Sequence, residues 1–124
     1  MNSGADNFEK LIGIQVVEVK DGYAKASLKI MRNHTNFIGV VHGGVVFTLA
    51  DCAFAKAVNF GKGGCVAIQV DINFLKASHE GDVLTAEAVR TSESKKLSLY
   101  HVKVYKKNEL IAFFSGVAYH KSKF

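Results

Sequence analysis

The segment 43-GGVVFTLADCAFAKAVN-59 is the only stretch of this 124-residue chain whose pattern predicts a long α-helix. Gly61, Gly63 and Gly64 follow it and predict where the helix ends. Its apolar residues leave no polar stripe, and a helix that is apolar nearly all round is buried nearly all round. The sequence therefore predicts one central helix, about 25 Å long at ~1.5 Å per residue, with the rest of the chain folded around it.

The segments before and after this helix have the patterns of β-strands. A short amphipathic turn around Phe8, Leu11 and Ile12 is followed by two expected strands, at 14–20 and 23–30, and four more come after the helix, at 66–75, 82–90, 96–105 and 110–120. Short connections imply antiparallel neighbours. We therefore expect an α+β domain in which one antiparallel sheet wraps around the helix, the hotdog arrangement. A four-stranded sheet with the helix on one face satisfies the same pattern.

Composition limits the chain to a single domain, residues 1–124, because no proline, linker or repeat marks a boundary. No stretch predicts a secretory signal or a membrane span, so a soluble cytoplasmic protein is expected. The net charge of +5 allows a polyanionic partner, but the chain lacks the pattern of nucleic-acid-binding modules. The cysteines and histidines have no metal-ligand spacing, so neither a metal nor a cofactor is expected.

Asp51 is an unusual residue for this helix, because only it and Lys56 carry a charge there. Burying an unpaired carboxylate costs free energy, so Asp51 is either paired, protonated or placed in a cleft for a function. Two interpretations are balanced on this feature alone. Asp51 is either a core residue satisfied by a hydroxyl or a partner subunit, or it is catalytic.

The start of the helix favours the catalytic interpretation. His42 is followed by Gly43 and Gly44, and glycines let a ligand approach the backbone N–H groups at the positive end of the helix dipole. Such N–H groups can stabilise the oxyanion that develops when a thioester carbonyl is attacked. The alternative is that the two glycines only make a tight junction between loop and helix.

The segment 33-NHTNFIGVVHGG-44, continued by 48-TLAD-51, resembles the signature of PaaI-type hotdog thioesterases, the group that includes thioesterase superfamily member 2. The matching pattern consists of Asn36, the His-Gly-Gly sequence six residues later, and Asp51. The similarity extends weakly over nearly the whole chain, including residues 70–76. It implies an enzyme that hydrolyses an aryl- or medium/long-chain acyl-CoA to the free acid and CoA.

The resemblance also implies roles for individual residues. Asp51 would be the general base or the nucleophile, and the Gly43 backbone N–H would polarise the thioester carbonyl. Asn36 would orient the substrate or the attacking water. His42 could contact the substrate, although fixing the loop is the simpler role. In this family the Asp and the Gly of one site come from opposite subunits, which implies a dimer as the active unit and usually a tetramer.

Further residues are expected to contact the substrate. Gly44 adjoins the proposed oxyanion donor. Gln69 stands where the family often has Ser or Thr, and its longer side chain would reshape the pocket, which leaves the acyl group open. Lys76, Lys95 and Lys96 fall where related enzymes place basic residues near the CoA phosphates, with ordinary solvated lysines as the alternative.

Two other functions compete with hydrolysis. A hotdog acyl-thioester dehydratase needs a histidine base, and its usual His-Phe-Pro loop does not exist in a chain without proline. A non-catalytic hotdog module could bind acyl-CoA as a sensor, but such a module has no need of a carboxylate at Asp51.

Overall fold

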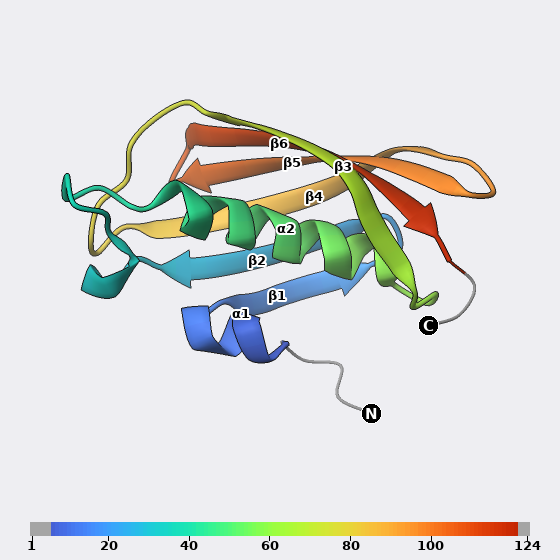
Figure 1. The fold of residues 1–124 in the computed structure, drawn as a ribbon, viewed down its shortest axis with the longest axis horizontal. Coiled ribbons are helices and arrows are strands. Elements are labelled where there is room, and N and C mark those ends of the chain that lie inside the picture. Colours follow the sequence, from blue (N-terminus) through green and yellow to red (C-terminus); the bar gives the residue numbers. More distant parts are fainter. Residues whose placement is uncertain (1–5, 122–124) are drawn as a thin grey trace.

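The computed structural model describes residues 6–121. A six-stranded antiparallel sheet wraps around the long helix α2 (Gly43–Asn59), as Figure 1 shows. The remaining elements are α1 (Asn7–Ile12), β1 (Gln15–Lys20), β2 (Tyr23–Lys29), the 3₁₀ turn η1 (Arg32–His34), β3 (Cys65–Phe74), β4 (Val83–Glu93), β5 (Leu97–Lys106) and β6 (Glu109–His120). The expected α+β hotdog fold is confirmed, and the four-stranded alternative is wrong.

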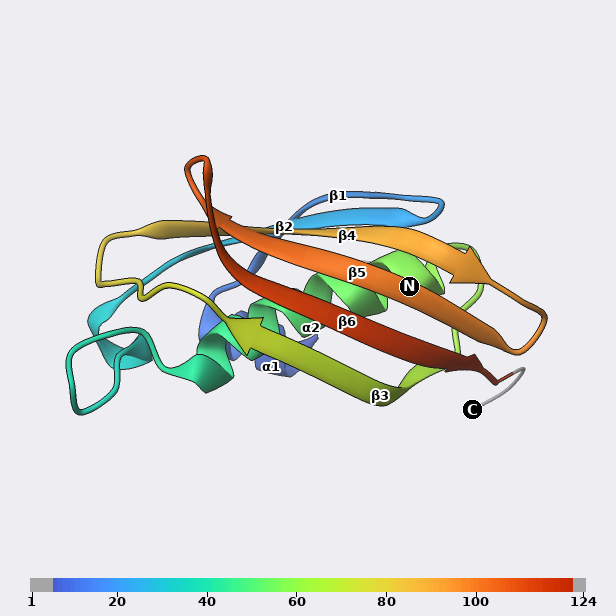
Figure 2. The ribbon, with the colours of Figure 1, turned by 90° about the horizontal axis from the view of Figure 1, so that it is seen from above.

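The strand order places β3 at one edge of the sheet. The order is β1-β2-β4-β5-β6-β3. The strand that follows α2, β3, pairs with the last strand β6, and β2 pairs with β4. Figure 2 shows β3 beside β6 and β1 at the opposite edge. Both edge strands therefore carry backbone groups that no neighbouring strand of this chain pairs.

Small residues on the sheet let α2 lie close against it. Alternate positions of β2 and β4 that face the helix are alanines and leucines, and they are fully buried. Phe54 of α2 packs edge-on against Tyr100 and tilted against Phe114. A Cβ atom at Gly116 would lie only 3.0 Å from both phenyl rings, so a side chain at this position would force the rings to shift.

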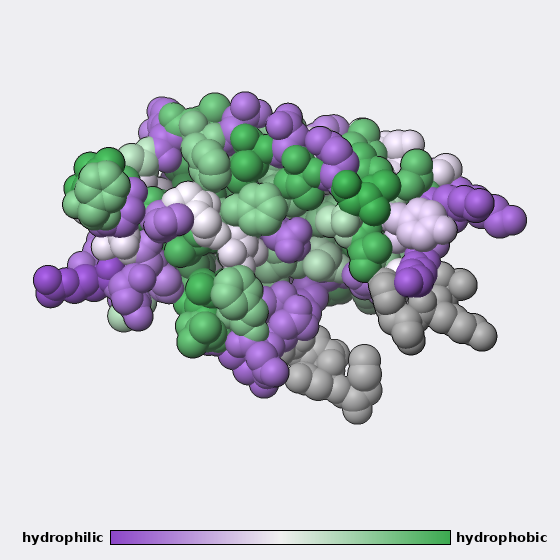
Figure 3. Space-filling model, in the orientation of Figure 1, coloured by the Kyte–Doolittle hydropathy of each residue, from purple (hydrophilic) through white to green (hydrophobic). Residues whose placement is uncertain are grey.

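The helix is less completely enclosed than its composition predicts. Asp51, Ala55 and Lys56 are only half-buried, because the sheet covers one side of α2 and leaves the other open. The edge strand β3 also exposes apolar side chains, and Figure 3 shows apolar residues gathered over the part of the surface that β3 occupies in Figure 1. The prediction of burial nearly all round is therefore wrong for this single chain.

Candidate active site

The N-terminus of α2 is capped by the side chain of His42. Its Nδ1 accepts the Gly44 N–H at 2.9 Å, so the ring proton lies on Nε2. The N–H groups of Val45 and Val46 both bond to the His42 carbonyl oxygen, at 2.9 and 3.4 Å. Among residues 6–121 the Gly43 N–H has no hydrogen-bond partner. The first turn thus presents one unoccupied donor at the positive end of the helix dipole.

The loop before α2 is held by the side chain of Asn36. Its Oδ1 accepts the N–H groups of Ile38 at 2.9 Å and of Val40 at 3.2 Å. The Asn36 backbone N–H also bonds to the Val40 carbonyl oxygen at 2.8 Å. The amide oxygen is therefore engaged within the loop, and the Nδ2 hydrogens are the groups that Asn36 can offer to a ligand.

His34 anchors the same loop to the N-terminal helix. Its Nδ1 accepts the Met31 N–H at 2.8 Å, so Nε2 carries the proton and donates to the Ile12 carbonyl oxygen at 2.8 Å. The His34 carbonyl oxygen in turn accepts the His42 N–H. This buried histidine positions the loop. Sequence reasoning assigned it no role, since its partners lie in another segment.

Asp51 is half-buried and has no hydrogen-bond or ion-pair partner among residues 6–121. Burial raises the pKa of its carboxyl group above the ordinary value of 3.8, and the negative charge of Glu9 adds to this effect. No hydroxyl of the described chain satisfies Asp51. Half-buried carboxylates with raised pKa values are typical of general bases.

Glu9 was not identified from the sequence. The amphipathic turn is present as α1, but Phe8 and Leu11 are 57% and 79% exposed, whereas Glu9 is 5% exposed. Glu9 faces α2, where its Oε1 lies 3.5 Å from Nζ of Lys56. The pattern of apolar residues pointed to the wrong side of α1, because an ion pair with a residue 47 positions away is invisible to local periodicity.

A cavity of about 330 Å³ opens beside the start of α2. It is lined by Gly43 and by mostly apolar residues of the preceding loop, the helix and the end of β3: Val40, Val41, Val46, Phe74, Leu75, Lys76 and Ala77. The phenyl ring of Phe74 would lie 3.4 Å from a Cβ atom at Gly43. Because position 43 has no side chain, a narrow ligand group has more room to approach the free N–H.

The three lysines expected near phosphate groups lie in two separate places. Lys76 follows the end of β3 and bonds to Glu109 at 2.8 Å. Lys95 and Lys96 lie near the opposite end of β3, in the turn between β4 and β5, and line a cavity of about 500 Å³. Its other lining residues are Lys62, Cys65, Tyr119, His120 and Lys121. Gln69 is exposed on the edge strand β3, next to a bulge after Ala67.

His120 is held rigidly in the wall of this basic cavity. Its Nδ1 lies 3.1 Å from the Lys95 carbonyl oxygen, which only accepts, so Nδ1 carries the proton. Nε2 therefore accepts the hydroxyl of Ser98 at 2.6 Å. Ser98 is fully buried, which excludes it as an accessible nucleophile and leaves a positioning role.

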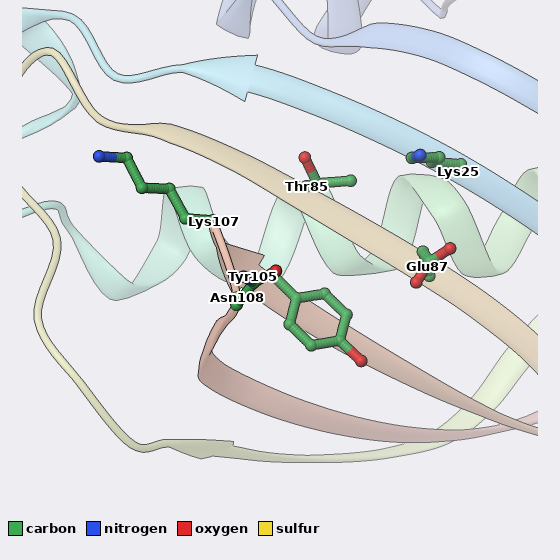
Figure 4. A pocket seen from close by; sticks show the side chains of 6 residues that line it. All are labelled: Lys25, Thr85, Glu87, Tyr105, Lys107 and Asn108. Atoms are coloured by element: carbon green, nitrogen blue, oxygen red, sulfur yellow. The ribbon is translucent and has the colours of Figure 1, made fainter.

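Another cavity, of about 420 Å³, lies on the face of the sheet that points away from α2. Figure 4 shows its lining residues, Lys25, Thr85, Glu87, Tyr105, Lys107 and Asn108. The Tyr23 hydroxyl donates to Glu87 at 2.5 Å, which together with burial raises the pKa of Tyr23 to about 12. Because strand residues alternate between faces, this cavity is separated from Asp51 and Gly43 by the sheet.

Residues 6–121 contain no cluster of three His, Cys, Asp or Glu side chains that could hold a metal ion. In the same range, no helix is long and apolar enough to cross a membrane.

Comparison with known proteins identifies the family to which this fold belongs. The family model of the thioesterase superfamily matches residues 38–112, from the loop before α2 into β6. The acyl-coenzyme A thioesterase PaaI of Escherichia coli is 31% identical over 112 residues, which cover 90% of this chain and 80% of that protein. Human acyl-coenzyme A thioesterase 13 is 32% identical over 95 residues, 73% of this chain and 68% of that protein.

A solved structure extends the similarity to the whole fold. A variant of the phenylacetic acid degradation protein PaaI from Thermus thermophilus superposes with a TM-score of 0.91 at 29% identity, covering 94% of this chain and 100% of that one. The chain belongs to the thioesterase superfamily. Within that superfamily it is a PaaI-type hotdog thioester hydrolase, as the signature around Asp51 predicts.

Proposed function

We propose that this protein hydrolyses acyl-CoA thioesters, with Asp51 as general base or nucleophile and the Gly43 N–H as the donor to the oxyanion. The observation that carries this proposal is the capping of α2 by His42, which occupies the Gly44 N–H and leaves that of Gly43 free. The two relatives named acyl-coenzyme A thioesterase support CoA esters as the substrate. A histidine base, which the dehydratase alternative needs, has no support, because Nδ1 of His42 already accepts a backbone N–H.

The chemistry follows from these two groups. Attack on the thioester carbonyl places negative charge on its oxygen, and a preoriented N–H at a helix N-terminus stabilises that charge. Asp51 in its charged form removes a proton from water or attacks the carbonyl itself. Because its carboxylate is half-buried and has no partner among residues 6–121, Asp51 is a stronger base than a solvated aspartate. The Nδ2 hydrogens of Asn36 and the Nε2–H of His42 would orient the substrate or the water.

One chain cannot bring both groups to the same thioester. Asp51 lies eight positions after Gly43 in a continuous helix, which at ~1.5 Å per residue is about 12 Å along the axis. A single carbonyl group and its attacking water span only a few ångströms. We infer that a complete site combines Asp51 of one subunit with Gly43 of a second, so that the active unit is a dimer. Assembly of dimers into a tetramer and a cytoplasmic location stay predictions.

The edge strand β3 is the surface that we assign to this dimer. This edge strand exposes the apolar side chains of Val66, Ile68 and Phe74 together with unpaired backbone groups. Pairing of two β3 strands would bring the helices of both subunits together. Gln69 lies on this edge, where it would contact the substrate or the second subunit.

A charge on this edge is expected to separate the subunits. Ile68→Glu should convert a dimer or larger assembly into a monomer and abolish turnover, because the carboxylate would be buried in the interface. The matched control is Val17→Glu on the opposite edge strand β1, since Val17 and Ile68 are 56% and 57% exposed and both lie at a bulge. Light scattering at assay concentration measures the mass. A monomer with full activity would disprove the shared site.

The basic cavity beside β5 is suited to the phosphates of CoA. Lys95, Lys96 and Lys121 line it together with Lys62, whose ammonium group pairs with Glu93. Several ammonium groups around a cavity attract a polyanion more strongly than the same charges spread over a surface. Gly44, close to the oxyanion donor, leaves room for the pantetheine arm. Lys76 lies too far away to join this group within one chain and could contribute only across a dimer.

The function is tested by a panel of acyl-CoAs that includes aryl, medium-chain and long-chain acyl groups. Release of free CoA, followed with a thiol-detecting reagent, is expected for at least one class of acyl group. The matching acyl-N-acetylcysteamine thioesters lack the phosphates, so they should show a raised KM with less effect on kcat. Absence of turnover across the whole panel would contradict the proposed function. Equal KM values for the acyl-CoAs and the matching N-acetylcysteamine thioesters would contradict the proposed phosphate site.

A further inference from the structure

His120 lies where the three chain segments that line the basic cavity meet. The lining residues come from the loop after α2, the turn between β4 and β5, and the end of β6: residues 62–65, 95–96 and 119–121. His120 pairs with Cys65 at the start of β3. Its backbone N–H bonds to the Lys96 carbonyl oxygen at 2.8 Å. The backbone of His120 thus joins the end of β6 to both other walls of the cavity.

Lys95 and Lys96 form the centre of the turn that joins β4 to β5. Ser94 closes this turn, because its N–H bonds to the Leu97 carbonyl oxygen at 2.7 Å and its hydroxyl oxygen accepts the Leu97 N–H at 3.2 Å. The carbonyl oxygens of both lysines bond to His120. That of Lys95 accepts the Nδ1–H at 3.1 Å, and that of Lys96 accepts the backbone N–H. One residue therefore fixes both central carbonyl groups of the turn.

The imidazole ring of His120 is itself held from the interior of the protein. Its Nε2 accepts the hydroxyl of Ser98 at 2.6 Å, and Ser98 is fully buried. A buried hydroxyl that loses its partner costs free energy, so this hydrogen bond is a firm anchor for the ring. Both ring nitrogens are therefore used within the protein. Two successive hydrogen bonds connect the buried Ser98 through His120 to the exposed backbone of Lys95.

We propose that His120 is a positioning residue for the phosphate groups of CoA, because it holds the Lys95–Lys96 turn in the conformation in which both lysines line the same cavity. This inference rests on the phosphate site that we proposed for that cavity. Two ammonium groups act together on one anion only if the backbone that carries them has a single conformation. A turn that is ordered before binding loses less entropy when the ligand arrives, and it therefore binds more tightly.

The experiment is a pair of substitutions, each of which retains one of the two hydrogen bonds of the ring. In His120→Gln the amide reaches the position of Nε2, so it keeps the bond with Ser98 and loses the bond to Lys95. In His120→Asn the shorter side chain places its amide near the position of Nδ1 and keeps the bond to Lys95. We expect His120→Gln to raise KM for acyl-CoA by about 3- to 10-fold with little change in kcat. His120→Asn should retain most of the wild-type affinity.

Two controls separate this role from a purely structural one. The acyl-N-acetylcysteamine thioesters lack the phosphates, so His120→Gln should leave their KM unchanged. His101→Gln makes the same chemical change in the middle of β5, at a histidine that bonds to Thr91 outside the cavity, and should leave KM for acyl-CoA unchanged. If His120 served only to satisfy Ser98, His120→Asn would lower the midpoint of thermal unfolding and His120→Gln would keep the wild-type KM. That pattern would overturn the inference.

Binding of CoA itself distinguishes this inference from the proposed hydrolysis. CoA carries the phosphates and has no thioester, so its Kd, measured by calorimetry, reports the phosphate site without any catalytic step. A higher Kd in His120→Gln than in the wild type and in His120→Asn supports the inference even if acyl-CoAs are not hydrolysed. Equal Kd values in the three proteins would overturn it, whatever the activity. A wild-type protein that does not bind CoA would overturn it together with the phosphate site.

Discussion

Replacing Gly43 with proline is expected to lower kcat for acyl-CoA hydrolysis by about 100- to 1000-fold while the fold stays intact. Proline removes the backbone N–H that we assign to the oxyanion. Position 43 is the first residue of α2, where proline is best tolerated because that N–H has no partner within the helix. The preceding His42 already has the extended conformation that proline requires, with φ −67° and ψ 135°. Steady-state kinetics and circular dichroism measure the two effects.

Gly43→Ala is the control for this substitution. It adds a Cβ atom 3.4 Å from the ring of Phe74, an ordinary contact, and keeps the N–H group. If the donor matters, the alanine variant should retain far more activity than the proline variant, with any loss appearing mainly in KM. Equal losses in both variants would show that the space at position 43 matters and that the N–H does not.

The second large effect is expected for Asp51→Asn, which should reduce hydrolysis by about 10²- to 10⁴-fold and still bind acyl-CoA. The amide fills the same space but neither accepts a proton from water nor attacks the thioester. Thiol release and a binding assay with the same acyl-CoA separate the two steps. Equal turnover by both proteins would refute the assignment of Asp51.

The same variant is expected to unfold at a higher temperature than the wild type at pH 7. Because burial raises the pKa of Asp51 above 3.8, the folded state binds this proton more tightly than the unfolded state does. Stability from this group is therefore complete below pH 3.8 and is lost as the pH rises through the folded pKa. Asparagine carries no such cost, so its advantage should be largest at neutral pH and shrink in acid. A variant that is less stable at pH 7 would show that the Asp51 charge is compensated.

Much of the fold was predictable because it follows from local patterns. The bounds of α2 match the prediction, since its apolar run and the glycines after it are local signals. The strands lie within a few residues of their expected positions, because side chains that alternate in a strand alternate in burial. The His-Gly-Gly start of α2 gained its meaning from the resemblance to the PaaI-type signature, since two glycines alone could equally make a tight junction.

Other features of the site depend on contacts between distant segments. The sequence placed Lys76 with Lys95 and Lys96, but β3 runs between them and separates them. It directed attention to Phe8 and Leu11 on α1, and the residue that faces α2 is Glu9.

By itself, the sequence determined the class of fold and the central helix, because each depends on composition or spacing along one segment. The resemblance to a known signature made Asp51 and Gly43 the candidates for the site. Only the tertiary structure decided which groups around them are free. Among residues 6–121, the Gly43 N–H and the Asp51 carboxylate have no partner, whereas the Gly44 N–H bonds to His42 and Lys56 pairs with Glu9. The first of these pairings depends on the conformation of His42 at the start of α2, and the second depends on how α1 packs against α2.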